Sequence, residues 1–342
     1  MKKIITIGID LAKNVFALHA VDAHGQVVWT KPAVKRAQLL ELIATIPQCV
    51  IGMEACTGAH HWAREFIKFG HTVRLIAPKF VIPYRMSGKR GKNDAHDAAA
   101  ICEAVTRPHM RFVPIKSLDA QAHLALHRVR QGFIEERTAL INRIRAVLAE
   151  FGIVLPQKAE VIRQRTGEFL EELPGFANRV VGDLLNHLQI LDDRINDYDH
   201  LLKQAAKEDH RSVRMMQVPG IGPTTATALL ASVGNAHDFK NGRQLAAWLG
   251  LVPGQYSSGG KPKLGRITKA GDRYIRTLLI LGARSVLASA AGKADRFSQW
   301  AIALQKRIGY GKALVAIAAK NARILWAMLS KGESFNLATW CK

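Results

Sequence analysis

The chain opens with short apolar runs separated by tight connections. Between Lys3 and about Val28 these runs are IITIGID, VFALHAV and QVVW, and His24 and Gly25 form a turn signal before the third. Short runs rich in β-branched residues and bounded by turn residues predict strands. We therefore expect an antiparallel meander of three strands at the start of the chain.

Helix-like and strand-like patterns then alternate. Apolar positions at helical spacing predict helices at residues 36–46, at 58–69 and from Asn93 onward, whereas CVIGME (49–54) and TVRLIAP (72–78) have the composition of buried strands. The resulting order, βββαβαβα, is that of an α/β ribonuclease H-like fold. Because the first and fourth strands of that fold are adjacent and parallel, Asp10 and Glu54 are expected at one edge of the sheet.

Long helical patterns dominate from about residue 117 to residue 216, chiefly at 124–151 and 177–206. In the second, apolar residues alternate at spacings of four and three, the seam of a coiled coil. The seam consists of Leu184, Leu188, Leu191, Ile195, Tyr198 and Leu202. The spacing leaves open whether this helix pairs with another copy of the chain or folds into a hairpin within it. In either case the region is expected to be a scaffold or an assembly surface.

The last third, residues 217–342, is predicted to be mainly helical, with helices around 243–249, from Asp272 and from Gly311. It begins with VPGIGPTTATALLA (218–231), which resembles the turn of a helix-hairpin-helix motif. Backbone N–H groups around Gly220 and Gly222 would then bind phosphate without reading sequence. The alternative is an ordinary Gly-Pro helix start. We thus expect three domains: residues 1–116, 117–216 and 217–342.

The charge of the chain indicates the kind of partner that it binds. Among the 342 residues, 49 are Lys or Arg and 27 are Asp or Glu, so the formal net charge is +22. Such an excess favours nucleic acid over the competing possibility of a membrane surface. The most apolar late segment, 313–328, contains Lys320, Asn321 and Arg323, so no transmembrane helix is predicted. The four cysteines lack zinc or disulfide spacing, which fits a reducing cytoplasm.

Four carboxylates form the candidate chemistry. Asn93 is a plausible N-cap, and Asp94 and Asp97 follow on one face of the first helical turn. Placed beside Asp10 and Glu54, they would repel one another unless divalent cations bind, and oxygen ligands favour Mg²⁺ or Mn²⁺. Two such ions about 4 Å apart can assist phosphodiester cleavage. Each acid alone has a simpler explanation as a strand end, a loop residue or a helix start.

Two basic segments lie near these features. The first comprises Arg85, Lys89, Arg90 and Lys92, just before the paired aspartates. The second follows two serines in a glycine-rich turn, Ser257 and Ser258, and comprises Lys261, Lys263, Arg266, Lys269, Arg273 and Arg276. We expect both to hold nucleic-acid backbone, although either could be only a solvated basic loop.

Taken together, the motifs resemble a known family. GIDLAK, GMEACTG, KNDAHDAAAICEA, VPGIGPTTA, GLVPGQYSSGGK and GRITKAGDRYIR occur in the order found in the bridge-RNA-guided insertion-sequence transposases of the IS110 family, especially its IS1111 subgroup. The resemblance implies a RuvC-like domain with a DEDD metal site at Asp10, Glu54, Asp94 and Asp97. It also implies a coiled-coil insertion and a C-terminal transposase domain with a serine nucleophile.

The resemblance also implies the mechanism. The family pattern P-G-x-x-x-S, counted from Pro253, places the nucleophile at Ser258, with Ser257 at a variable position. The acids and the serine would form a composite site between subunits of a dimer or tetramer, and attack would link the serine covalently to DNA without a nucleotide cofactor. A structured guide RNA would select the DNA, and the protein would act in the bacterial cytoplasm, at the nucleoid.

Other functions remain open at this point. A metal-dependent nuclease, such as a Holliday-junction resolvase, would use water as the nucleophile and the serine loop only to bind DNA. A nonenzymatic nucleic-acid-binding protein would use neither site. A sugar-kinase-like ATPase shares the early strand pattern but needs further glycine-rich phosphate loops near the acids, and the sequence has none there.

Overall fold

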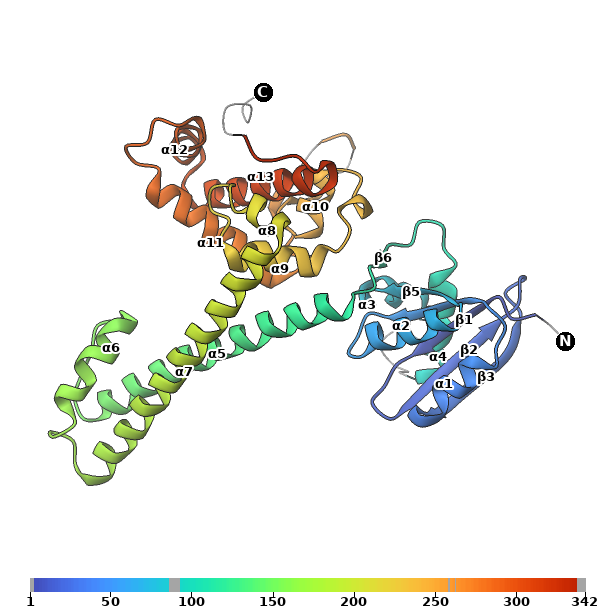
Figure 1. The fold of residues 1–342 in the computed structure, drawn as a ribbon, viewed down its shortest axis with the longest axis horizontal. Helices are drawn as coiled ribbons and strands as arrows, with labels where there is room; N and C mark the ends of the chain where they lie inside the picture. The colour runs from blue at the N-terminus through green and yellow to red at the C-terminus, as the bar shows by residue number, and fades with distance from the viewer. Residues whose placement is uncertain (1–2, 86–92, 258, 262, 337–342) are drawn as a thin grey trace. The chain divides into compact units, whose positions relative to one another are not determined.

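A computed structural model describes residues 3–85, 93–257, 259–261 and 263–336 (Figure 1). The chain divides into two compact units, Met1–Ser117 and Leu118–Lys342. The division of the second unit into a middle and a C-terminal domain stays a prediction.

The first unit is built on a mixed sheet of order β3-β2-β1-β4-β5-β6. Strand β1 pairs parallel with β4 and β4 pairs parallel with β5, whereas the β1–β2, β2–β3 and β5–β6 pairs are antiparallel. This is the ribonuclease H-like arrangement that the sequence predicts. The strands are β1 (Thr6–Asp10), β2 (Val15–Val21), β3 (Val27–Lys35), β4 (Val50–Glu54), β5 (Thr72–Ile76) and β6 (Phe112–Val113).

The helices of this unit cover both faces of the sheet. Ile7, Ile9, Ile51 and Met53 form one core with the helices α1 and α2, whereas α4 packs on the other side of β1, β2 and β4. The helices are α1 (Leu39–Ala44), α2 (Ala59–Lys68), α3 (Pro78–Val81) and α4 (Asp94–Val105), with 3-10 turns η1 (Arg36–Gln38) and η2 (Ile82–Tyr84).

Two glycines decide how closely α4 approaches the sheet. A Cβ built on Gly8 would lie 2.1 Å from the carbonyl oxygen of Ala98, and one on Gly52 would lie 2.9 Å from Cβ of Val105. Gly8 and Gly52 are direct partners in the β1–β4 pair, so the sheet surface under the helix has no side chains at this point. Because side chains alternate along a strand, Asp10 and Glu54 project to this same face.

The second unit is almost entirely helical. It contains α5 (Leu118–Glu150), α6 (Ala159–Arg165), η3 (Thr166–Phe169), α7 (Gly175–Glu208), α8 (His210–Met215), α9 (Pro223–Val233), η4 (Ala236–Asp238), α10 (Gly242–Trp248), α11 (Arg273–Ser289), α12 (Arg296–Ile308) and α13 (Tyr310–Lys331). A short antiparallel pair of strands, β7 (Pro253–Gln255) and β8 (Leu264–Ile267), interrupts the helices.

The long helices α5 and α7 pack against each other within the chain (Figure 1). The predicted seam of α7 faces this contact, because Leu188, Leu191, Ile195 and Leu202 are buried and Leu184 packs against the same core. Of the two alternatives left open by the spacing, the structure has the intramolecular hairpin.

Helix α13 is a core helix of the second unit. It packs against α10, α11 and α12, and Ile317, Ala322 and Leu325 are fully buried. By length and composition alone this helix could cross a membrane. Its apolar side chains are instead used in the core cluster shared with α9, α10 and α11.

Candidate metal centre and serine hairpin

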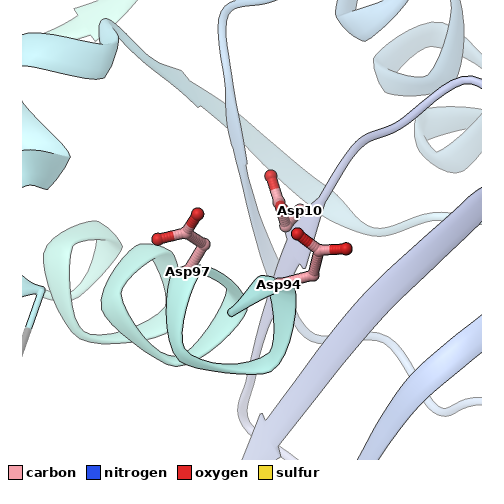
Figure 2. A group of neighbouring side chains, drawn as sticks. All are labelled: Asp10, Asp94 and Asp97. Carbon is pink, nitrogen blue, oxygen red and sulfur yellow. The ribbon is translucent and has the colours of Figure 1, made fainter. Parts of the chain in front are cut away.

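Three aspartates from two elements converge in the first unit. Asp10 ends β1, and Asp94 and Asp97 lie in the first turn of α4. One carboxylate oxygen of each lies within 4.8 Å of those of the other two. Figure 2 shows the carboxylates of Asp94 and Asp97 rising from the same side of α4, toward Asp10. Of the four acids that the sequence places together, these three meet within this distance, and Glu54 is not in that group.

The start of α4 is fixed by its cap. The side chain of Asn93 accepts a hydrogen bond from the backbone N–H of Ala95 at 3.0 Å, as its predicted N-cap role requires. This puts Asp94 and Asp97 where the helix dipole favours negative charge. Asp97 is only 4 % exposed, so its charge has to be balanced nearby.

Glu54 joins the three aspartates through an arginine. Nη2 of Arg85 donates to Oε1 of Glu54 at 3.1 Å, and Nε of Arg85 lies 2.9 Å from Oδ1 of Asp97. Arg85, predicted to contact nucleic acid, is therefore engaged with two of the acids. The remainder of its basic run, Lys89, Arg90 and Lys92, lies outside the described residues.

Cys56 follows Glu54 by two residues, and its pKa is affected by the acids. Partial burial of the sulfur and, after it, the negative charges of Glu54 and Asp10 raise the pKa of Cys56, although the residue as a whole is exposed. Clustered carboxylates of this kind provide the hard oxygen ligands that divalent cations prefer, so the residues present fit a metal site.

In the second unit, the two glycines of the predicted phosphate-binding turn have different surroundings. Gly220 has φ of +84°, and its Cβ would lie 2.6 Å from the carbonyl oxygen of Gly282 in α11, so its backbone is packed against that helix. Gly222 precedes α9, and a Cβ there would meet no atom within 4 Å. The open side of this turn is thus at Gly222.

The serine loop is a hairpin between β7 and β8. The hydroxyl oxygen of Ser257 accepts hydrogen bonds from Nε2 of Gln255 at 2.8 Å and from the backbone N–H of Lys263 at 3.2 Å. These bonds tie the hydroxyl of Ser257, an exposed residue, to the backbone and side chain of the hairpin. Ser258 lies outside the described residues.

The predicted basic residues of the hairpin region divide into two groups. Exposed ones are Lys261, Lys263, Arg266, Lys269 and Arg273. Arg276 is half-buried, and its Nη1 donates to the backbone carbonyls of Leu249 at 3.0 Å and of Gly271 at 3.2 Å. Arg276 therefore braces the start of α11 against the end of α10.

Sequence reasoning missed an aromatic side chain on this hairpin. Tyr256 is 76 % exposed, and one edge of its ring passes over the two facing strands, 3.7 Å from a Cβ built on Gly254 and 3.4 Å from one built on Gly265. An exposed aromatic among basic residues is typical of surfaces on which nucleobases stack. The signal was present in the sequence as a tyrosine beside the glycines of a basic loop.

Comparison with known proteins defines the class. Residues 7–153 match the DEDD transposases of the IS110 type, and residues 212–299 match the family described as Transposase IS116/IS110/IS902. The protein is thus an insertion-sequence transposase with a DEDD catalytic domain, and as such it acts on DNA.

Similarity over the full length identifies the family. A Pseudomonas aeruginosa protein named a probable family 20 transposase is 47% identical over 95% of this chain and 96% of its own length. The transposase for insertion sequence element IS1111A of Coxiella burnetii is 42% identical over 98% and 92%, and that for IS1328 of Yersinia enterocolitica is 38% identical over 98% and 100%. The chain belongs to the IS110/IS116/IS902 transposase family.

Proposed function

We propose that this transposase cuts and rejoins DNA with Ser258 as the nucleophile and with Mg²⁺ or Mn²⁺ held by Asp10, Glu54, Asp94 and Asp97. The observation that carries the metal assignment is the convergence of three aspartate oxygens within 4.8 Å, with Glu54 tied to Asp97 through Arg85. A divalent cation in such a site supplies positive charge to the attacking and leaving oxygens of a phosphodiester.

The choice of Ser258 over Ser257 is supported by the hairpin. Both lone pairs of the Ser257 oxygen accept hydrogen bonds from within the hairpin, and a nucleophile needs a free lone pair directed at phosphorus. On attack the Ser258 oxygen forms a new P–O bond while a P–O bond of the strand breaks, and the serine proton passes through solvent to the leaving oxygen. The phosphoserine link retains the phosphodiester energy for rejoining.

The exposed basic residues of the hairpin, together with Tyr256, are proposed to hold DNA near Ser258, and the turn at Gly222 to contact phosphate. Selection of the DNA by a structured guide RNA, assembly as a dimer or tetramer, and action at the nucleoid of the bacterial cytoplasm complete the proposal. The +22 charge supports a polyanionic partner.

A covalent adduct tests the nucleophile. The full chain is incubated with Mn²⁺ and duplex DNA carrying the element ends, and products are resolved under denaturing conditions. We expect a protein–DNA adduct from wild type and Ser257→Ala but none from Ser258→Ala or Asp10→Asn. Strand cleavage by Ser258→Ala without an adduct would identify a water-using nuclease instead.

RNA that copurifies with the protein from its host, when sequenced, tests the proposed guide RNA.

A further inference from the structure

Arg85 lies at a distinctive position relative to the acids. It follows η2 directly and reaches one carboxylate at the end of β4 and another in the first turn of α4. Side-chain exposure is 27 % for Arg85, 13 % for Glu54 and 5 % for Asp97. Partial burial strengthens these charge interactions relative to those at a fully solvated surface.

The contacts are close but poorly suited to a permanent ion pair. The guanidinium does not grip one carboxylate with two parallel hydrogen bonds, the strongest arrangement available to arginine. It contacts two carboxylates with one nitrogen each, and Nε is buried without a hydrogen-bond acceptor among the described residues, although Oδ1 of Asp97 is 2.9 Å away. The distance therefore satisfies an ion pair while the angle does not satisfy a hydrogen bond.

We propose that Arg85 is an internal counter-cation, which neutralises Glu54 and Asp97 while the metal is absent and competes with the metal for these two carboxylates. This inference rests on the proposed metal site and adds a regulation to it. Contacts made only in the metal-free state lower metal affinity, because they must break when the metal binds. The released guanidinium becomes a cation beside the site, where a DNA phosphate can bind it.

The competition couples DNA to metal. A phosphate that binds the released guanidinium stabilises the state in which Glu54 and Asp97 are available, so DNA raises metal affinity and metal raises DNA affinity by the same factor. The acids would then be loaded fully only when DNA is present. Premature cleavage chemistry in free protein is thereby suppressed by the protein's own side chain.

The test measures Mn²⁺ affinity of the full chain by calorimetry without DNA. Arg85→Gln is expected to tighten binding on the order of tenfold, a usual size for such coupling. The matched control is Arg107→Gln, which removes an equal charge and an ion pair to Glu103. Like Asp97, Glu103 lies on α4, but it is outside the acid cluster. The control is expected to bind Mn²⁺ as wild type does.

Unchanged or weaker Mn²⁺ binding by Arg85→Gln overturns the inference while leaving the metal site intact. Absence of Mn²⁺ binding in wild type and in both variants overturns the metal site itself. A second measurement covers a variant that fails to fold: added duplex DNA is expected to tighten Mn²⁺ binding by wild-type protein. An affinity for Mn²⁺ that duplex DNA leaves unchanged would refute the coupling.

Discussion

Replacing Gly8 by alanine tests whether the acid cluster depends on the close approach of α4 to the sheet. The added Cβ would lie 2.1 Å from the carbonyl oxygen of Ala98 and 2.4 Å from the backbone nitrogen of Cys102. Both are backbone atoms of α4, so no side-chain rotation relieves the overlap. The helix itself has to move away from β1.

The size of the movement follows from the same distances. Ordinary contact begins near 3.4 Å, so the overlap with Ala98 requires a displacement of about 1.3 Å. Catalytic and metal-binding groups tolerate errors of only about 0.5 Å. The displacement would carry Asp94 and Asp97 away from Asp10, and overpacking against backbone should cost about 3 kcal/mol of unfolding free energy.

Mn²⁺ titration by calorimetry and denaturant unfolding of the same samples measure both effects. We expect Gly8→Ala to weaken Mn²⁺ binding at least tenfold. Gly52→Ala should do less, because its Cβ would meet the side chain of Val105 at 2.9 Å rather than backbone. Native Mn²⁺ affinity and native stability in Gly8→Ala would refute the account of how α4 positions the acids.

Three further predictions concern the second unit. Burial lowers the pKa of His127 to about 4, so the imidazole is neutral in the folded state. The associated stability, about 3 kcal/mol, is present above pH 6.5 and is lost as the pH falls from 6.5 towards 4. Denaturant titrations at several pH values measure this loss, and a free energy of unfolding that stays constant over this range would contradict the prediction. Tyr256→Ala should weaken DNA binding in fluorescence anisotropy about tenfold while Tyr256→Phe does not, and equal loss in both would point away from stacking. Gly132→Ala, in the interior of α5 with no atom within 4 Å of the new Cβ, should raise the unfolding free energy by about 0.5–1 kcal/mol, and a decrease would show an unseen clash.

Much of the first unit could be predicted because its strands and helices have recognisable local sequence patterns. The strand-like run CVIGME corresponds to β4, and the N-cap at Asn93 begins α4 where expected. The parallel pairing of β1 with β4 follows from the element order, so the placement of Asp10 and Glu54 at the same edge of the sheet was predictable too. The third strand runs further than expected, to Lys35, because exposed polar residues on an edge strand hide its pattern.

Other features depend on contacts that no local pattern encodes. Arg85 pairs with Glu54, which lies 31 positions earlier in the sequence, and with Asp97 in the helix that follows, whereas the surrounding basic run suggested nucleic acid instead. The β7–β8 hairpin was predicted as a loop, because strands this short and rich in glycine lack alternation. Helix α12 was missed, and α5 begins at Leu118, ahead of the apolar pattern that marked it.

The proposed metal centre and the fold of the first unit would depend on each other. Its acids come from β1, β4 and α4, and glycines rather than interlocking side chains bring the helix against the two strands. A cation bound by these acids would therefore tie together elements that are otherwise held by a smooth backbone contact. Binding to the folded state alone stabilises it by about 2.7 kcal/mol at a hundredfold excess over the dissociation constant. Because Arg85 bridges β4 and α4 through Glu54 and Asp97, the gain in wild type should be smaller than in Arg85→Gln. The stability difference between chelator and Mn²⁺ therefore measures that bridge independently of recombination.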